Sequence, residues 1–294
     1  MIGEFASLGA ALTFGVSTIL ARRFMSVLSP EAGVLVSIVV NVVAFVTLSC
    51  LAAARGLLPP ILPVSIVLFV AGGLAGTLVG RNLSYLALNR LGAGRTVTIR
   101  LSNALFSLMI AYALLHELPR AMQLVGLVAV TAGLWISLRP AAAVPSSPTR
   151  AVDVGGVFVA LGSAAAFALG DTARRAGLHL TPAPVLGAAI GATGALAAHL
   201  TWSIFNRSAR WPATAALWRF DVLGSAVLNT AAILLLYTGL QHSPVAIVSV
   251  LYNLQVLVVL AAGPLILRGQ EHVTPWLLVG ALLALIGTGL ILLG

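Results

Sequence analysis

The sequence repeats itself at half its length. The first matches pair Leu8-Gly9 with Leu161-Gly162, Phe14 with Phe167, and Ala21-Arg22-Arg23 with Ala173-Arg174-Arg175. Later matches pair Tyr85 with Tyr237, Asn103 with Asn253 and Glu117 with Glu271. Each copy contains five apolar segments. If each segment crosses a membrane, the odd number per copy places the second copy upside down relative to the first. Inverted repeats of this kind enclose a binding site at the bilayer midplane.

The composition excludes an ordinary soluble domain. Hydrophobic residues make up 60% of the chain, charged residues 8%, and the mean hydropathy is +1.09, whereas soluble domains carry about 25% charged residues. The apolar segments are long enough to span a bilayer as helices, and the sequence lacks the short alternating segments of a transmembrane barrel. The expected spans are 3–21, 31–53, 61–88, 93–115, 121–138, 154–174, 183–205, 221–240, 244–267 and 273–293.

We therefore predict an all-α membrane protein with ten transmembrane helices, arranged as two inverted-topology five-helix repeats around a central cavity. The first repeat covers residues 1–138 and the second covers 154–294. The segment 139–153 between them is rich in proline, serine and small residues, which is typical of a semi-extended linker.

All 16 basic residues are arginine, and the net charge is +9. The arginines lie mostly at the ends of the expected spans, where they contact lipid headgroups, so membrane lipid is an expected partner and nucleic acid is not. More loop arginines fall on the side opposite the termini. The positive-inside rule therefore predicts that both termini lie outside the cytoplasm.

The sequence lacks the motifs of a membrane-embedded enzyme or an ATP-driven pump. It contains no HExxH, no Gly-x-Ser-x-Gly elbow and no phosphate-binding glycine loop. We predict neither enzymatic activity nor a cofactor or metal. The single cysteine, Cys50, forms no disulfide within the chain and is expected to be a small buried side chain.

Polar side chains within membrane spans are costly, so their positions indicate a cavity. Several expected spans carry polar residues along one face, which turns that face toward protein or water. The candidate substrate-binding residues are Phe14, Ser17, Arg81, Tyr85, Arg100, Asn103, Phe167, Asn229, Tyr237, Tyr252 and Asn253. For each serine or asparagine, hydrogen bonding between helices is the alternative role.

Arg81 and Arg100 are the two basic residues expected well inside the membrane. They flank the turn at Leu91-Gly92 at similar distances, so a rise of 1.5 Å per residue places both about 12 to 15 Å from the same membrane face. We expect them to be neighbours. Their guanidinium groups would suit a substrate carboxylate or phosphate, and the alternative partners are backbone carbonyls, Asn103 or water.

Six of the seven acidic residues are expected at helix ends, and Glu117 and Glu271 among them precede the last span of each repeat. Asp171 is the exception in position, but it is expected to pair with Arg174 and Arg175, which follow it by three and four residues. This assignment leaves no carboxylate near the midplane. It therefore favours facilitated movement over proton antiport through a central carboxylate.

Three stripes of small residues predict close helix packing rather than substrate contact. They are Gly72, Gly76 and Gly80; Gly187, Gly191 and Ala195; and Gly280, Ala284 and Thr288.

Three features of the sequence resemble the drug/metabolite transporter superfamily of the EamA type. They are the two units, the turn His116-Glu117-Leu118-Pro119 with its counterpart Gly269-Gln270-Glu271, and Tyr85-Leu86-Ala87-Leu88 with Tyr237-Thr238-Gly239-Leu240. The resemblance covers nearly the whole chain. It implies an exporter of amino acids and related metabolites in the bacterial inner (plasma) membrane. Many relatives carry their positive loops on the terminal side, which conflicts with the orientation predicted from the arginines.

From these observations we expect a secondary transporter that exports amino acids and similar small metabolites by alternating access, facilitatively and as a monomer. The alternative substrate class is phosphorylated or carboxylated organic anions, favoured by Arg81 and Arg100. A channel is not predicted, because ten unequal helices in one chain do not suggest a ring-symmetric filter.

Overall fold

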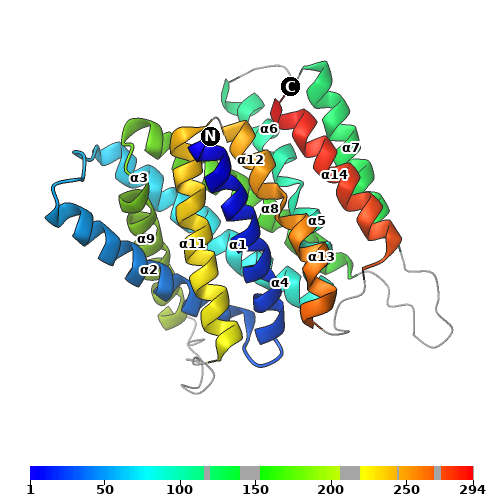
Figure 1. Ribbon diagram of the computed structural model, residues 1–294, viewed down its shortest axis with the longest axis horizontal. Coiled ribbons are helices and arrows are strands. Elements are labelled where there is room, and N and C mark those ends of the chain that lie inside the picture. Colours follow the sequence, from blue (N-terminus) through cyan, green and yellow to red (C-terminus); the bar gives the residue numbers. More distant parts are fainter. Residues whose placement is uncertain (116–119, 140–152, 206–218, 244, 268–272, 294) are drawn as a thin grey trace.

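The protein is described by a computed structural model covering residues 1–115, 120–139, 153–205, 219–243, 245–267 and 273–293. Within these ranges the regular structure is entirely helical (Figure 1), as expected for an all-α chain. Glu117, Glu271 and nearly all of the linker 139–153 lie outside the described residues.

The helices broadly follow the expected spans. The first half forms α1 (Ile2–Phe24), α2 (Pro30–Ala54), α3 (Pro63–Gly72), the π-helix η1 (Gly73–Gly80), α4 (Arg81–Leu91), α5 (Ala93–Arg100), α6 (Asn103–Leu115) and α7 (Ala121–Ser137). The second half forms α8 (Val154–Leu180), α9 (Pro184–Phe205), α11 (Phe220–His242), α12 (Val245–Asn253), α13 (Gln255–Leu267) and α14 (Pro275–Leu293). Among the described residues, 8 helical stretches are long and apolar enough to cross a membrane, and Ala121–Ser137 is a shorter apolar helix.

Exactly ten transmembrane helices are not confirmed among the described residues, and the structure divides the expected span 93–115 into α5 and α6. The helix tightens at Leu101, whose backbone N–H donates to the carbonyl of Thr98 at 3.1 Å. The related segment of the second half is interrupted between α12 and α13, where the N–H of Leu254 donates to Leu251 at 3.2 Å. One break ends just before Asn103 and the other begins just after Asn253, so both repeats are interrupted near the same asparagine.

Local sequence explains where several helices begin and end. The Ser29 hydroxyl accepts a hydrogen bond from the Ala32 N–H at the start of α2, and Pro30 occupies the first turn. Asp153 caps α8 in the same way through the Gly156 N–H, at 3.0 Å. Gly92, with φ of 87°, ends α4 in a backbone conformation that residues with a Cβ atom rarely adopt.

The helices that open the two repeats run in opposite directions. At the end of α1, the Phe24 ring lies 6.0 Å from that of Tyr85 in α4. By contrast, the first turn of α8 packs on Arg90 and Leu91 at the end of α4. The start of α1 and the end of α14 lie at the same face of the molecule (Figure 1).

Each of these opening helices packs mainly against the other repeat. α1 contacts α11, α12 and α13, whereas α8 contacts α3, η1, α4 and α6. The two halves of the sequence therefore interlock, and residues from both meet at the centre of the molecule.

The last helices of the repeats, α7 and α14, form a pair at the edge of the bundle (Figure 1). A Cβ atom at Gly133 would lie 2.5 Å from the Ala284 nitrogen, and one at Gly280 would lie 2.5 Å from the Gly133 carbonyl. Small residues allow this backbone contact where lipid provides no hydrophobic force for association. The predicted packing role of this stripe is thus what the structure shows.

Cys50 is exposed on the outer surface of α2 rather than buried. The expectation of a buried side chain was wrong because the outward face of a membrane helix is as apolar as its inward face, and hydropathy alone does not separate the two.

Candidate functional site

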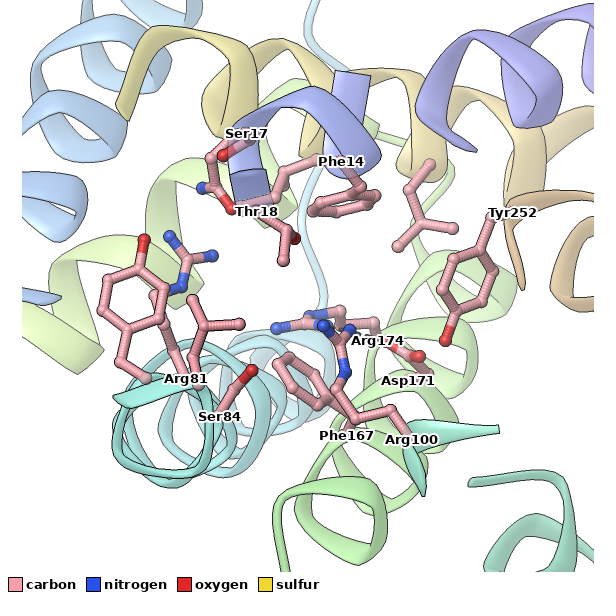
Figure 2. Close-up of a pocket in the computed structure, with 15 residues that line it drawn as sticks. Phe14, Ser17, Thr18, Arg81, Ser84, Arg100, Phe167, Asp171, Arg174 and Tyr252 are labelled. Atoms are coloured by element: carbon pink, nitrogen blue, oxygen red, sulfur yellow. Dashed lines mark hydrogen bonds and ion pairs between the residues drawn. The ribbon is translucent and has the colours of Figure 1, made fainter. Parts of the chain in front are cut away.

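The described residues enclose a cavity of about 50 Å³ between helices of both repeats (Figure 2). Its lining comes from α1, α4, α5, α8, α11 and α12. The lining residues are Phe14, Ser17, Thr18, Arg81, Ser84, Tyr85, Leu88, Arg100, Phe167, Asp171, Arg174, Asn229, Ile233, Leu236 and Tyr252.

Most of the sequence-predicted site residues meet at this cavity. Those that line it are Phe14, Ser17, Arg81, Tyr85, Arg100, Phe167, Asn229 and Tyr252. The remaining three, Asn103, Tyr237 and Asn253, do not line it. Whether any of these residues contacts a substrate stays a prediction.

The three residues outside the lining lie close behind it. Asn103 donates a hydrogen bond to the Tyr252 hydroxyl at 2.7 Å, which ties α6 to α12 across the two helix breaks. The buried ring of Tyr237 lies 6.0 Å from the guanidinium carbon of Arg174. Asn253 is buried, and its Nδ2 has no hydrogen-bond partner among the described residues.

Arg81 and Arg100 both line the cavity, as their positions around the turn at Leu91-Gly92 predict. Arg81 donates to the Ser37 hydroxyl of α2 at 2.7 Å. Arg100 lies over the Phe167 ring of α8, with its guanidinium carbon 4.5 Å from the ring centroid. Each side chain is thereby held by a neighbouring helix.

A second charged pair, Asp171 and Arg174, also lines the cavity. The structure extends α8 to Leu180, so these residues lie inside a helix and not at its end. Arg174 donates to Asp171 at 2.7 Å, which confirms their expected pairing. The expectation that no carboxylate accompanies the inner arginines was wrong, because it rested on ending the helix at residue 174.

A groove formed by Gly72 and Gly76 holds the Arg174 side chain. A Cβ atom at Gly72 would lie 2.7 Å from the Arg174 Cγ, and one at Gly76 would lie 2.5 Å from its Nη2. The same Nη2 donates to the Thr77 hydroxyl at 3.0 Å. The glycine stripe therefore packs against α8, as predicted, and also makes room for a buried arginine.

Asp171 and Arg174 are missing from the predicted site because consecutive arginines usually indicate the end of a span. The signal that would have found them is the apolar segment Ala176-Gly177-Leu178, which continues the helix beyond Arg175. Ser84 is also missing from the predicted site, although this residue follows Arg81 by three positions and so shares its helix face.

The charges at the cavity are unbalanced. Three arginines line it against a single aspartate, and Figure 2 shows Arg100, Arg174 and Asp171 close together. Electrostatic interactions are strong where water is scarce, so excess positive charge attracts an anion. Guanidinium groups also match the geometry of carboxylate and phosphate oxygens.

One solved structure, described only as "Crystal structure of protein", matches 98% of this chain and 95% of its own, with a TM-score of 0.63 and 16% sequence identity. At this identity the match shows a shared fold. A comparison with curated proteins finds no match.

The EamA-like transporter family matches residues 1–139 and 154–293. These two matches correspond to the repeats found in the sequence, and they cover nearly all of the chain. Together with the apolar helices, they make this protein an integral membrane protein and a transporter of small solutes. The chain belongs to the EamA-like transporter family.

Proposed function

We propose that this protein is a secondary carrier of small organic anions that bear a phosphate or carboxylate group. The observation that carries the proposal is the set of three cavity arginines, Arg81, Arg100 and Arg174, against one aspartate, Asp171. A phosphate monoester carries about two negative charges near neutral pH, as does a dicarboxylate. Either would balance the net positive charge of these four groups.

The positions of the arginines suit recognition of an anion. They come from three different helices, α4, α5 and α8. The side chain of Arg81 is restrained by Ser37, that of Arg100 by Phe167 and that of Arg174 by Thr77. A binding site whose donors are fixed before the ligand arrives loses less conformational entropy on binding.

The small volume of the cavity supports an alternating-access mechanism. About 50 Å³ is room for a few water molecules, whereas ligand pockets measure about 300 to 1,000 Å³. A substrate therefore requires the lining helices to separate. The breaks beside Asn103 and Asn253 lie next to the cavity, where a change of helix direction would open it toward one membrane face.

Amino-acid export is the second candidate, and Asp171 supports it. Its carboxylate beside Arg174 places opposite charges in one cavity, and a zwitterion could bind its ammonium group to Asp171 and its carboxylate to Arg81 or Arg100. In both cases we place the protein in the bacterial inner membrane and expect it to move substrate outward.

Counterflow into proteoliposomes tests this proposal. Vesicles containing the purified protein are loaded with an unlabelled sugar phosphate, dicarboxylate, amino acid or neutral sugar, and uptake of the labelled compound is measured. We expect trans-stimulated uptake of the phosphate or dicarboxylate and none of the neutral sugar. Saturable counterflow would also distinguish a carrier from a channel.

The variant Arg100→Gln links the activity to the cavity. We expect it to reduce the apparent affinity for the anion about tenfold or more, because a hydrogen bond to a charged group contributes about 1.5 to 3 kcal/mol. Arg23→Gln, which changes an exposed arginine in the last turn of α1, is the matched control. Unchanged anion counterflow in Arg100→Gln, or counterflow of amino acids alone, would contradict the anion assignment.

A further inference from the structure

We propose that Asp171 is a built-in counter-anion of the carrier. It neutralises Arg174 when no substrate is bound, and it releases this arginine to the incoming anion. The return of the substrate-free carrier across the membrane then depends on Asp171. This inference rests on the proposed transport of anions and adds the residue that decides between net transport and obligatory exchange.

The two members of the pair are held very differently. Arg174 lies in the groove of Gly72 and Gly76, donates to Thr77 and faces the Tyr237 ring. Among the described residues, Arg174 is the one hydrogen-bond partner of the Asp171 carboxylate. A substrate oxygen can therefore replace the Asp171 oxygen by a rotation of one short side chain, while the arginine stays in place.

Asp171 also lies where substrate would compete with it. It lines the same cavity as Arg81 and Arg100, and its side chain is 20% exposed against 7% for Arg174. Figure 2 shows its carboxylate beside the guanidinium groups of Arg100 and Arg174. An anion that reaches these arginines from the cavity therefore competes with the Asp171 carboxylate, which is already bound there.

The charge balance explains the consequence for transport. With Asp171 ionised, three arginines face one carboxylate, and a bound dianion neutralises the remainder. Without Asp171, the substrate-free carrier would rearrange with three uncompensated guanidinium groups in a poorly hydrated site. A buried charge that loses its partner is strongly destabilising. The substrate-free step should therefore slow far more than the loaded step.

The experiment compares net efflux with counterflow exchange in the same proteoliposomes, using the anion that wild-type protein exchanges fastest. For Asp171→Asn we expect exchange to be retained with a tighter apparent affinity. The ratio of net efflux to exchange should fall about 100-fold or more, the lower end of what one uncompensated buried charge costs. Asp171→Glu keeps the charge and should restore most of the ratio.

A double variant separates charge balance from structure. Asp171→Asn combined with Arg174→Gln leaves Arg81 and Arg100 as the charged lining groups, which restores the wild-type net charge. We expect its ratio of net efflux to exchange to recover, although its affinity for the anion falls. The control is Asp221→Asn, which breaks the 2.9 Å pair with Arg219 at the start of α11 and should leave the ratio unchanged.

The outcomes distinguish this inference from the proposed function. If wild-type protein exchanges no anion, the proposed function fails and the role of Asp171 falls with it. If wild-type protein exchanges anions but Asp171→Asn keeps the wild-type ratio, or loses exchange together with net efflux, the inference alone is overturned. A double variant with the low ratio of Asp171→Asn would also overturn it.

Discussion

The two repeats share a backbone pattern but supply different chemistry to the cavity. At the offset of 152 residues that pairs Tyr85 with Tyr237, Arg81 corresponds to Ile233 and Ser84 to Leu236. All four of these positions line the cavity. One repeat therefore contributes polar groups where the other contributes apolar ones. Pseudo-symmetry positions the side chains, and departures from it determine what they can bind.

The third span of each repeat shows the same departure in its backbone. In the first repeat it includes the π-helix η1, whereas its counterpart α11 is a regular helix. By the same offset, Gly76 corresponds to Leu228 and Gly80 to Ala232. π-Helical segments are rare and are often found at functional sites. Here the irregular segment supplies Gly76 and Thr77, which accommodate Arg174 beside Gly72 at the end of α3.

Replacing Gly76 with the leucine of the second repeat should produce the largest effect. The new Cβ would lie 2.5 Å from the Arg174 Nη2, so Gly76→Leu displaces the guanidinium from its groove and from Asp171. Disruption of a buried ion pair costs about 3 to 5 kcal/mol. We expect a large fall in thermal stability in detergent and no transport. Gly289→Leu, at a position with no atom within 4 Å of a Cβ, is the control, and equal losses in both variants would contradict this explanation.

The next effect should come from making the cavity more symmetric. Arg81→Ile introduces the residue that the second repeat carries, removes one guanidinium from the lining, and leaves the Ser37 hydroxyl without its 2.7 Å donor. We expect the apparent affinity for the anion, measured by counterflow, to fall about 10- to 100-fold, which corresponds to about 1.4 to 2.8 kcal/mol of binding free energy. Binding measured by isothermal titration checks this value. Wild-type affinity in Arg81→Ile would show that the asymmetry is irrelevant to the anion.

The paired asparagines provide a more moderate test. Asn103 donates to Tyr252, whereas the Nδ2 of Asn253 has no partner among the described residues. Asn103→Ala should therefore reduce the free energy of unfolding by about 1 to 3 kcal/mol, because a buried hydroxyl loses its partner. Asn253→Ala should cost less. Denaturation of the two variants in detergent measures this difference. A greater loss of stability in Asn253→Ala than in Asn103→Ala would contradict the prediction.

The smallest effect concerns how the repeats begin. Asp153 caps α8, whereas Met1 provides no side-chain cap for α1. Asp153→Ala should cost about 1 kcal/mol and leave counterflow unchanged, because Asp153 lies away from the cavity lining. Thermal melting beside wild-type protein measures this difference. A loss of counterflow in a stable Asp153→Ala protein would assign this residue a role beyond capping.

Sequence patterns anticipated much of the cavity because position along a helix fixes depth in a membrane. Arg81 and Arg100 were expected to be neighbours from their distances to one turn, and both line the cavity. Tyr237 could not be separated from the lining in this way. Hydropathy shows that a residue lies on a polar face, but the packing of other helices decides whether it reaches the cavity or stops behind it.

The amino-acid sequence alone determined that this protein is a helical membrane protein built from two repeats, because composition, segment length and internal similarity need no tertiary contacts. Only the tertiary structure shows that Asp171 and Arg174 line the cavity. It also shows that helices are interrupted beside Asn103 and Asn253, and that each opening helix packs against the other repeat. The physical reason is solvation. Consecutive arginines mark a helix end when lipid is the only surrounding, but Gly72, Gly76 and Thr77 of another helix provide a polar groove in which one of them stays inside the membrane.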